Sequence, residues 1–153
     1  MVRSSLVLIG LLLSLGCATA PRVPVRHVVG SAEAPTFRIS QGKGTAVLLL
    51  NEATGARAAS LGVLELETGA QVAEHVHESS VEMLYVEEGS AEMTVEGQPF
   101  TLKAGDGVYI PAGVRHSARV PEGTPRLRAV QVYVGPGPEQ RFRQGTPVTL
   151  PSP

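Results

Sequence analysis

The sequence predicts an all-β domain, and three observations support this prediction. Short apolar runs recur at a spacing of roughly ten residues along most of the chain, as in a β sandwich or barrel. Turn-forming residues separate the runs, and the chain is rich in them, with 17 glycines and 12 prolines among 153 residues. No helix-length segment with helical periodicity lies between the runs, which argues against a helical bundle or a doubly wound fold.

The composition limits the classes of function. The formal net charge is −1, from 13 Lys+Arg and 14 Asp+Glu, so the chain lacks the basic excess of a dedicated nucleic-acid-binding protein. The single cysteine excludes a disulfide framework. With 42% hydrophobic and 18% charged residues, the chain has enough apolar side chains for a folded core, and its length suits one domain.

Residues 1–16 are expected to be an export signal. Arg3 precedes an apolar stretch from Leu6 to Leu15, and small residues follow it. The stretch is about ten residues long, whereas a membrane-spanning helix needs about twenty, so a permanent transmembrane anchor is not expected. Residues 17–35 contain three prolines and little periodicity, and they are expected to form a tether to the domain.

Two alternative cleavage sites are compatible with the sequence at the end of this signal. Ala18-Thr19-Ala20 fits the small-x-small rule of ordinary signal peptidase, but it leaves Pro21 beside the cut. Leu15-Gly16-Cys17 resembles the lipobox of bacterial lipoproteins, in which the cysteine becomes the lipid-modified first residue. This resemblance implies a domain held at a membrane of the cell envelope by a lipid on Cys17. The alternative is a soluble periplasmic or secreted protein.

Residues 36–134 are expected to form the β domain. Alternation is clearest from Ala91 to Glu96, where Ala91, Met93 and Val95 would face inward. Residues 135–153 form a Pro/Gly-rich tail that is expected to lie along the surface, with Thr146–Leu150 as an added edge strand. The ten expected strands are Thr36–Ser40, Thr45–Asn51, Ala58–Glu67, Gln71–His77, Val81–Glu87, Ala91–Val95, Pro99–Leu102, Gly107–Ile110, His116–Val120 and Arg126–Val134.

Three histidines and one glutamate are placed where they could converge. His75 and His77 are two residues apart, so their side chains would point to the same face of a strand. Glu82 lies five residues beyond His77, which leaves room for a turn into a neighbouring antiparallel strand. His116 follows the turn Pro111-Ala112-Gly113 at the start of another strand. Three imidazoles and one carboxylate inside a small barrel would form a site for a divalent transition metal.

These two segments resemble the two signature motifs of the cupin superfamily. Gly69, His75, His77, Glu82 and Gly89 match every fixed position of the first motif. Gly105, Pro111, Gly113 and His116 match the second, although Val120 stands where asparagine is usual. The resemblance covers Ala58 to Tyr133 and implies a small single-domain cupin with an antiparallel double-stranded jelly-roll barrel. It also implies one metal near the mouth of the barrel, with His75, His77, Glu82 and His116 as ligands.

Two classes of function remain open. The first is a metalloenzyme with dioxygenase-like or isomerase- or lyase-like chemistry on a small molecule, and the second is a non-catalytic cupin that binds or senses a small ligand. The metal could be Zn, Cu, Ni, Mn or Fe, and for a chain exported unfolded the affinity order favours the first three. No dinucleotide, phosphate-loop or nucleophile motif indicates an organic cofactor.

Other residues of this site are less well defined by the sequence, and no catalytic residue is assigned. Tyr85 could assist proton transfer. The sequence also leaves open whether two copies of the chain form a homodimer by pairing their edge strands. Five residues could line the pocket or serve as ordinary strand residues: Tyr85, Arg115, Arg128, Gln131 and Tyr133.

Overall fold

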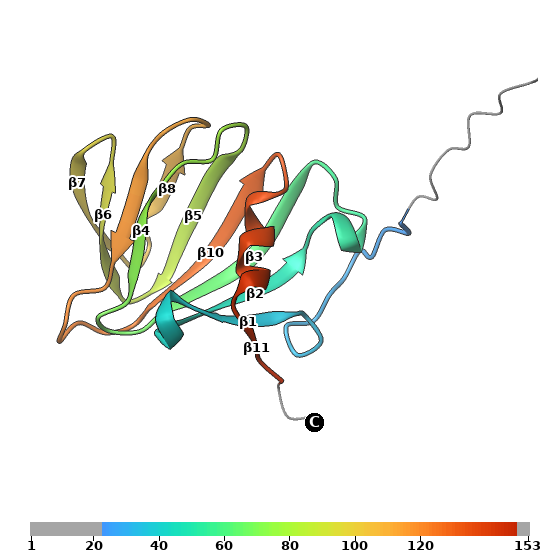
Figure 1. Ribbon diagram of the computed structural model, residues 1–153, viewed down its shortest axis with the longest axis horizontal. Coiled ribbons are helices and arrows are strands. Elements are labelled where there is room, and N and C mark those ends of the chain that lie inside the picture. The colour runs from blue at the N-terminus through green and yellow to red at the C-terminus, as the bar shows by residue number, and fades with distance from the viewer. Residues whose placement is uncertain (1–22, 150–153) are drawn as a thin grey trace, which may run out of the picture.

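The described part of the chain folds into two antiparallel β-sheets that enclose the core between them (Figure 1). The computed structural model describes residues 23–149. The larger sheet has the strand order β11-β1-β2-β3-β10-β5-β8, and the smaller has the order β4-β9-β6-β7. All neighbouring pairs are antiparallel, so the predicted all-β jelly-roll class is confirmed. The strands are β1 Thr36–Ile39, β2 Gly44–Leu50, β3 Ala59–Leu66, β4 Gln71–His75, β5 Val81–Glu88, β6 Ser90–Val95, β7 Gln98–Lys103, β8 Gly107–Ile110, β9 His116–Arg119, β10 Leu127–Val134 and β11 Thr146–Pro147.

Most of the buried apolar residues in the described part of the chain form two core clusters. The main cluster fills the space between the two sheets and includes Leu66, Val86 and Ile110, each at most 1% exposed. The second lies under β1 and β2 and consists of Phe37, Ala46, Leu48, Tyr133 and Phe142. Burying one such large apolar side chain contributes about 1.5–3 kcal/mol, so these clusters supply the main driving force for the fold.

Alternation along the strands decides which side chains enter this core. On β6, Ala91 and Met93 are buried, as predicted, while their neighbours are more exposed. On β10, the buried positions are Leu127, Ala129, Gln131 and Tyr133, so every second residue faces inward. Gln131 is thus the one amide in a row of apolar and aromatic inward positions.

Gly89 allows the sharp turn that joins β5 to β6. Its φ is +75°, a left-handed conformation that side chains with a Cβ disfavour. A Cβ at this position would also collide with the backbone carbonyl of Arg126. Glycine is therefore required here, where the chain passes from the larger sheet to the smaller.

Three short 3-10 helices occur among the strands of residues 23–149: η1 Ser40–Gly42, η2 Glu52–Thr54 and η3 Pro138–Gln144. The sequence did not predict them, because helices of three to seven residues are too short to show a periodicity. None of the helices found within residues 23–149 is long and apolar enough to cross a membrane. The expected export signal and Cys17 lie outside the described residues.

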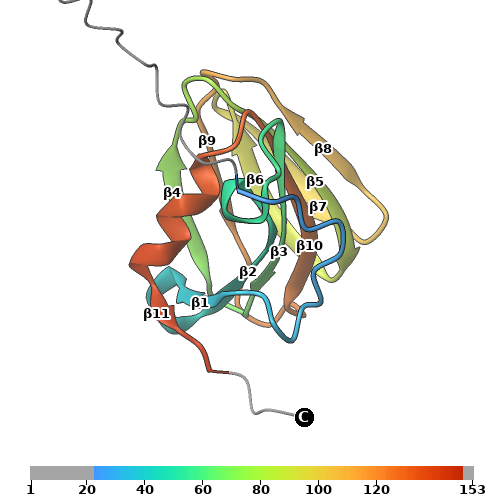
Figure 2. The same cartoon turned by 90° about the vertical axis from the view of Figure 1, so that its right-hand side faces the viewer.

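The C-terminal tail contains more structure than its composition suggests. The η3 helix lies along one side of the barrel, between β4 and the β1 edge (Figure 2). Phe142 of η3 is 6% exposed and packs in the second core cluster, so the tail is anchored in the core rather than lying only on the surface. After η3, the two residues of β11 pair with Phe37 and Arg38 of β1. Leu150, the expected end of this edge strand, lies outside the described part of the chain.

Candidate metal centre

The structure brings His75, His77, Glu82 and His116 together, and we call these four residues the donor cluster. One ligand atom from each lies within 4.8 Å of the others, so the cluster could hold a metal ion. His75 ends β4 and pairs with His116, the first residue of β9, in the ladder between these strands. Glu82 is the second residue of β5 in the other sheet. The centre therefore spans both sheets of the barrel.

Glu82 is the hydrogen-bonding hub of the donor cluster. Its Oε2 lies 3.0 Å from His77 Nε2 and 3.0 Å from His116 Nε2. Its Oε1 accepts a hydrogen bond of 2.7 Å from the side-chain amide of Gln131 on β10. The side chain of Glu82 is only 5% exposed, so these partners replace most of its water.

The backbone sets the orientation of two imidazole rings. His75 Nδ1 lies 2.8 Å from the carbonyl oxygen of Ala73, and His116 Nδ1 lies 2.9 Å from that of Val114. A carbonyl only accepts, so both Nδ1 atoms donate and each neutral ring directs the lone pair of Nε2 into the cluster. A backbone carbonyl on the second ring nitrogen is the arrangement that orients metal-binding histidines in general.

The donor set fits a divalent transition metal. His75 Nε2 is buried and has no hydrogen-bond partner among the described residues, although buried polar atoms nearly always have one. At His116, the lone pair of Nε2 faces a carboxylate oxygen, so a proton or a cation must lie between them. Three imidazole nitrogens and one carboxylate oxygen are ligands that Zn, Cu, Ni and Fe accept.

The environment shifts the pKa values of the donor cluster. Burial alone would raise the pKa of Glu82, but hydrogen bonds from the imidazole and amide partners outweigh it and hold this pKa well below its usual range. Burial lowers the pKa of His75 to about 4, with a contribution from the charge of Arg141. Burial also opposes protonation of His116, but its hydrogen bond with Glu82 prevails and raises its pKa. At neutral pH, His75 is therefore ready to bind a cation without losing a proton.

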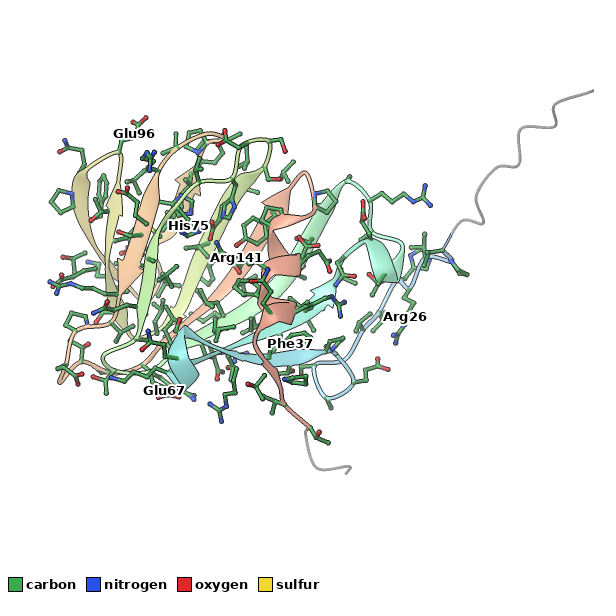
Figure 3. The ribbon with its side chains drawn as sticks, in the orientation of Figure 1. Arg26, Phe37, Glu67, His75, Glu96 and Arg141 are labelled. Carbon is green, nitrogen blue, oxygen red and sulfur yellow. The ribbon has the colours of Figure 1, made fainter. Side chains whose placement is uncertain are left out.

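The donor cluster lies beside a cavity of about 750 Å³ between the two sheets. Residues of η1 and η3 also line it, so the N-terminal and C-terminal parts of the domain meet at the cavity. In Figure 3, the labels His75 and Arg141 mark β4 and η3, two of the elements that contribute to this lining. Much of the wall is apolar, and its apolar residues are Ile39, Leu64, Leu66, Val72, Ala73, Leu84, Ala91, Met93, Leu102, Ala118, Leu127 and Phe142.

Comparison with known proteins identifies the family. The family described as "Cupin domain" matches residues 62–133, which contain the whole donor cluster. The chain is 32% identical over 123 residues to the tetracenomycin polyketide synthase protein TcmJ of Streptomyces glaucescens, an alignment that covers 80% of this chain and 81% of that protein. The chain belongs to the cupin family.

Solved structures show the same cupin fold. The polyketide cyclase RemF from Streptomyces resistomycificus superposes with a TM-score of 0.64 at 21% identity, over 74% of this chain and 82% of that one. A protein described as a predicted oxalate decarboxylase from Thermotoga maritima gives a TM-score of 0.62 at 27% identity, over 70% of this cupin and 97% of that chain.

The sequence pointed to five further residues, and two of them reach the site of this cupin. Gln131 binds Glu82, and the Tyr133 ring packs edge-on against the His77 ring at a centroid distance of 5.1 Å. Burial, followed by the nearby Glu82 charge, raises the pKa of Tyr133 far above its usual range, so its hydroxyl keeps its proton. That hydroxyl is buried without a hydrogen-bond partner among the described residues.

The other three residues point away from the cavity. Tyr85 is 54% exposed because it follows Leu84, which faces inward, so the suggestion that Tyr85 assists proton transfer at the donor cluster is wrong. Arg115 pairs with Glu74 on the surface at 3.3 Å. Arg128 pairs with Glu65 and Glu87 on the outer face of the larger sheet.

Sequence reasoning missed Arg141, which lines the cavity from η3. It lies in the Pro/Gly-rich tail, outside both signature motifs, and no local pattern marks it as a site residue. Only the packing of the tail against the barrel brings it to the donor cluster.

Proposed function

We propose that this cupin is a metal-dependent enzyme that acts on a largely apolar, oxygen-bearing small molecule. The observation that carries the proposal is the position of the donor cluster at a large apolar cavity, whose wall includes three of the four donors, His75, Glu82 and His116. Four protein ligands leave coordination positions free on a metal that accepts five or six. A purely structural metal would instead be expected in a closed site.

The chemistry that we favour is Lewis-acid catalysis, of the isomerase or lyase type. A divalent metal held by the donor cluster would polarise a carbonyl oxygen of the substrate. Gln131 would fix the carboxylate of Glu82, and the backbone carbonyls behind His75 and His116 would fix the imidazoles. The apolar wall would exclude water around the reacting group.

The names of two similar proteins support a substrate class. TcmJ is named as a polyketide synthase protein and RemF as a polyketide cyclase. Polyketide chains carry carbonyl groups along an otherwise apolar backbone, which suits an apolar cavity with a metal in its wall. We therefore propose for this cupin a polyketide-like substrate with carbonyl groups on alternate carbon atoms.

The test is metal content followed by metal-dependent turnover. Wild-type protein is expected to contain one divalent metal by elemental analysis, and His77→Ala and Glu82→Ala are expected to lose it. An ester of 3,5,7-trioxooctanoate is then incubated with metal-loaded and metal-free protein. In this chain C2 can attack the C7 carbonyl, so that a six-membered ring forms and the C7 oxygen leaves as water. Faster ring closure with metal, equal in air and under nitrogen, supports the proposal.

The alternatives give different results in the same experiment. Turnover that requires oxygen would favour the dioxygenase-like class. Stoichiometric metal without any turnover would favour a non-catalytic binding cupin. No metal in the wild type, together with unchanged thermal stability of both variants, would overturn the metal centre itself.

We also propose that the protein is exported and lipid-anchored through Cys17. The n-region and apolar stretch of residues 1–16 and the lipobox-like Leu15-Gly16-Cys17 support this. In that location the affinity order favours Zn, Cu or Ni, and envelope-purified protein with stoichiometric iron alone would contradict this choice. Labelled palmitate should enter the wild type and not Cys17→Ala.

Homodimer formation stays a prediction that analytical ultracentrifugation can test.

A further inference from the structure

Arg141 is a cation at the cavity with no acidic partner. It is partly buried and lines the same cavity as His75 and His116. Among residues 23–149, no carboxylate forms an ion pair with its guanidinium and no side chain or carbonyl forms a hydrogen bond with it. Arginines on the outer faces differ, since Arg115 pairs with Glu74 and Arg119 pairs with Glu92.

The fold holds η3, the segment that carries Arg141, in a defined place. Phe142, the next residue, is buried in the second core cluster, and the Arg141 guanidinium carbon lies 5.1 Å from the centre of its ring. Glu139 is 4% exposed, and its carboxylate accepts hydrogen bonds from Ser60 Oγ at 3.1 Å and from Gly137 N at 2.7 Å. With anchors on both sides, Arg141 is positioned before any ligand binds.

The charge balance of the cavity is positive. Among the described residues that line it, Glu82 is the only acidic one, whereas Arg38 and Arg141 both carry positive charge. That gives two positive charges against one negative charge before a divalent cation is added. A charge near apolar walls is poorly solvated, so an unpaired arginine there favours a bound anion strongly.

We propose that Arg141 is a specificity-determining residue that binds a carboxylate on an otherwise apolar substrate. Guanidinium groups bind carboxylates through two parallel hydrogen bonds, and the apolar wall would receive the rest of the molecule. The inference rests on the proposed function, because it takes the donor cluster as the reaction centre. It adds that the substrate carries a carboxylate, which Arg141 binds while the metal faces the carbonyl groups.

The test compares charged and neutral ligands of the same shape. Isothermal titration calorimetry is run with benzoate, 2-naphthoate and 2-anthroate, and with the three corresponding amides, on metal-free and zinc-loaded protein. Arg141→Gln is expected to weaken binding of the best carboxylate about tenfold or more, the size of one charged hydrogen bond, while amide binding stays unchanged. Arg141→Lys should retain part of the preference. Arg143→Gln, an exposed arginine of the same helix outside the cavity lining, is the matched control and should behave like wild type.

Three results would overturn the inference. They are a wild type that does not prefer carboxylates over amides, an Arg141→Gln variant that loses both ligands equally, and a preference that disappears in Arg38→Gln but persists in Arg141→Gln. The metal-free arm separates this inference from the proposed function. A carboxylate preference that depends on Arg141 in a protein that takes up no metal would support the role of Arg141 and contradict the metalloenzyme.

Discussion

Gln131 donates a hydrogen bond of 2.7 Å to Glu82 Oε1, and this bond fixes the carboxylate so that Oε2 faces the imidazoles. Gln131→Leu leaves Oε1 buried without this partner. We expect the affinity for divalent metal to fall about 10–100-fold, as for other residues that orient metal ligands. Competition with a chromogenic chelator measures the metal affinity of both proteins. Arg128→Gln is the control, because Arg128 lies on the same strand but on its outer face. Equal losses in both variants would assign the effect to general damage of β10.

The stability of the metal-free protein should depend on Glu82 much more than on His75. Glu82→Ala leaves two buried imidazole nitrogens without their carboxylate, and breaking such a buried pair typically costs about 3 kcal/mol or more. His75→Ala removes Nε2, which has no partner among the described residues, and one exposed hydrogen bond from Nδ1 to the Ala73 carbonyl, so the loss of stability should be smaller. Urea unfolding in the presence of a chelator gives both values. Equal losses would contradict the tautomers and hydrogen bonds assigned to the donor cluster.

Metal binding should release a proton near neutral pH. The pKa of His116 is raised, so part of its population is protonated there and must lose that proton when a cation binds. Metal affinity is therefore expected to rise with pH up to this raised pKa and to level off above it. Calorimetry in buffers of different ionisation enthalpy counts the protons released. An affinity independent of pH between 6 and 8 would be incompatible with a protonated His116.

His75 should make the metal-free protein less stable in mild acid. Its pKa is lowered by burial from 6.5 to about 4, so the unfolded chain binds a proton in this range before the folded chain does. The free energy of unfolding therefore falls as the pH falls from about 6.5 to about 4. In His75→Ala this part of the decline should disappear, giving a shallower curve. His27→Ala, which changes an exposed residue far from the donor cluster, should keep the wild-type curve.

The C-terminal tail should contribute to stability through Phe142. Its ring is 6% exposed and belongs to the second core cluster, so Phe142→Ala is expected to cost about 3 kcal/mol. Phe100 is 51% exposed on β7, and Phe100→Ala is the matched control with a loss below about 1 kcal/mol. Thermal and urea unfolding measure both. A tail that merely lies on the surface would give two equally small losses.

The sequence predicted the parts of the site that follow from short-range rules. The rings of His75 and His77 lie close together, with centroids 4.8 Å apart, although β4 ends at His75 and the expected strand Gln71–His77 was therefore too long. Turn residues bound the strands that bring Glu82 and His116 to them. The same rule explains the error at Tyr85. With Glu82 and Leu84 facing inward, a period of two directs Tyr85 outward.

What could not be predicted depends on long-range packing. Arg141 reaches the cavity only because Phe142 enters the core and β11 pairs with β1, and neither contact leaves a local pattern. The left-handed backbone at Ser40 and Gln41 in η1 could not be predicted either, because neither residue type favours this conformation. Hydrophobic periodicity therefore fails to predict short 3-10 segments that close a cavity.

The donor cluster and η3 occupy separate stretches of the chain, and this separation has an evolutionary consequence. The four donors fall between His75 and His116, within the β strands and their turns, where most changes would disturb the fold. Residues 138–144 form a short segment after the last long strand, and they contribute side chains to the same cavity. Mutations in that segment can alter which molecule is accepted while the reactive centre is inherited intact, so new substrates can be acquired without reinventing the chemistry.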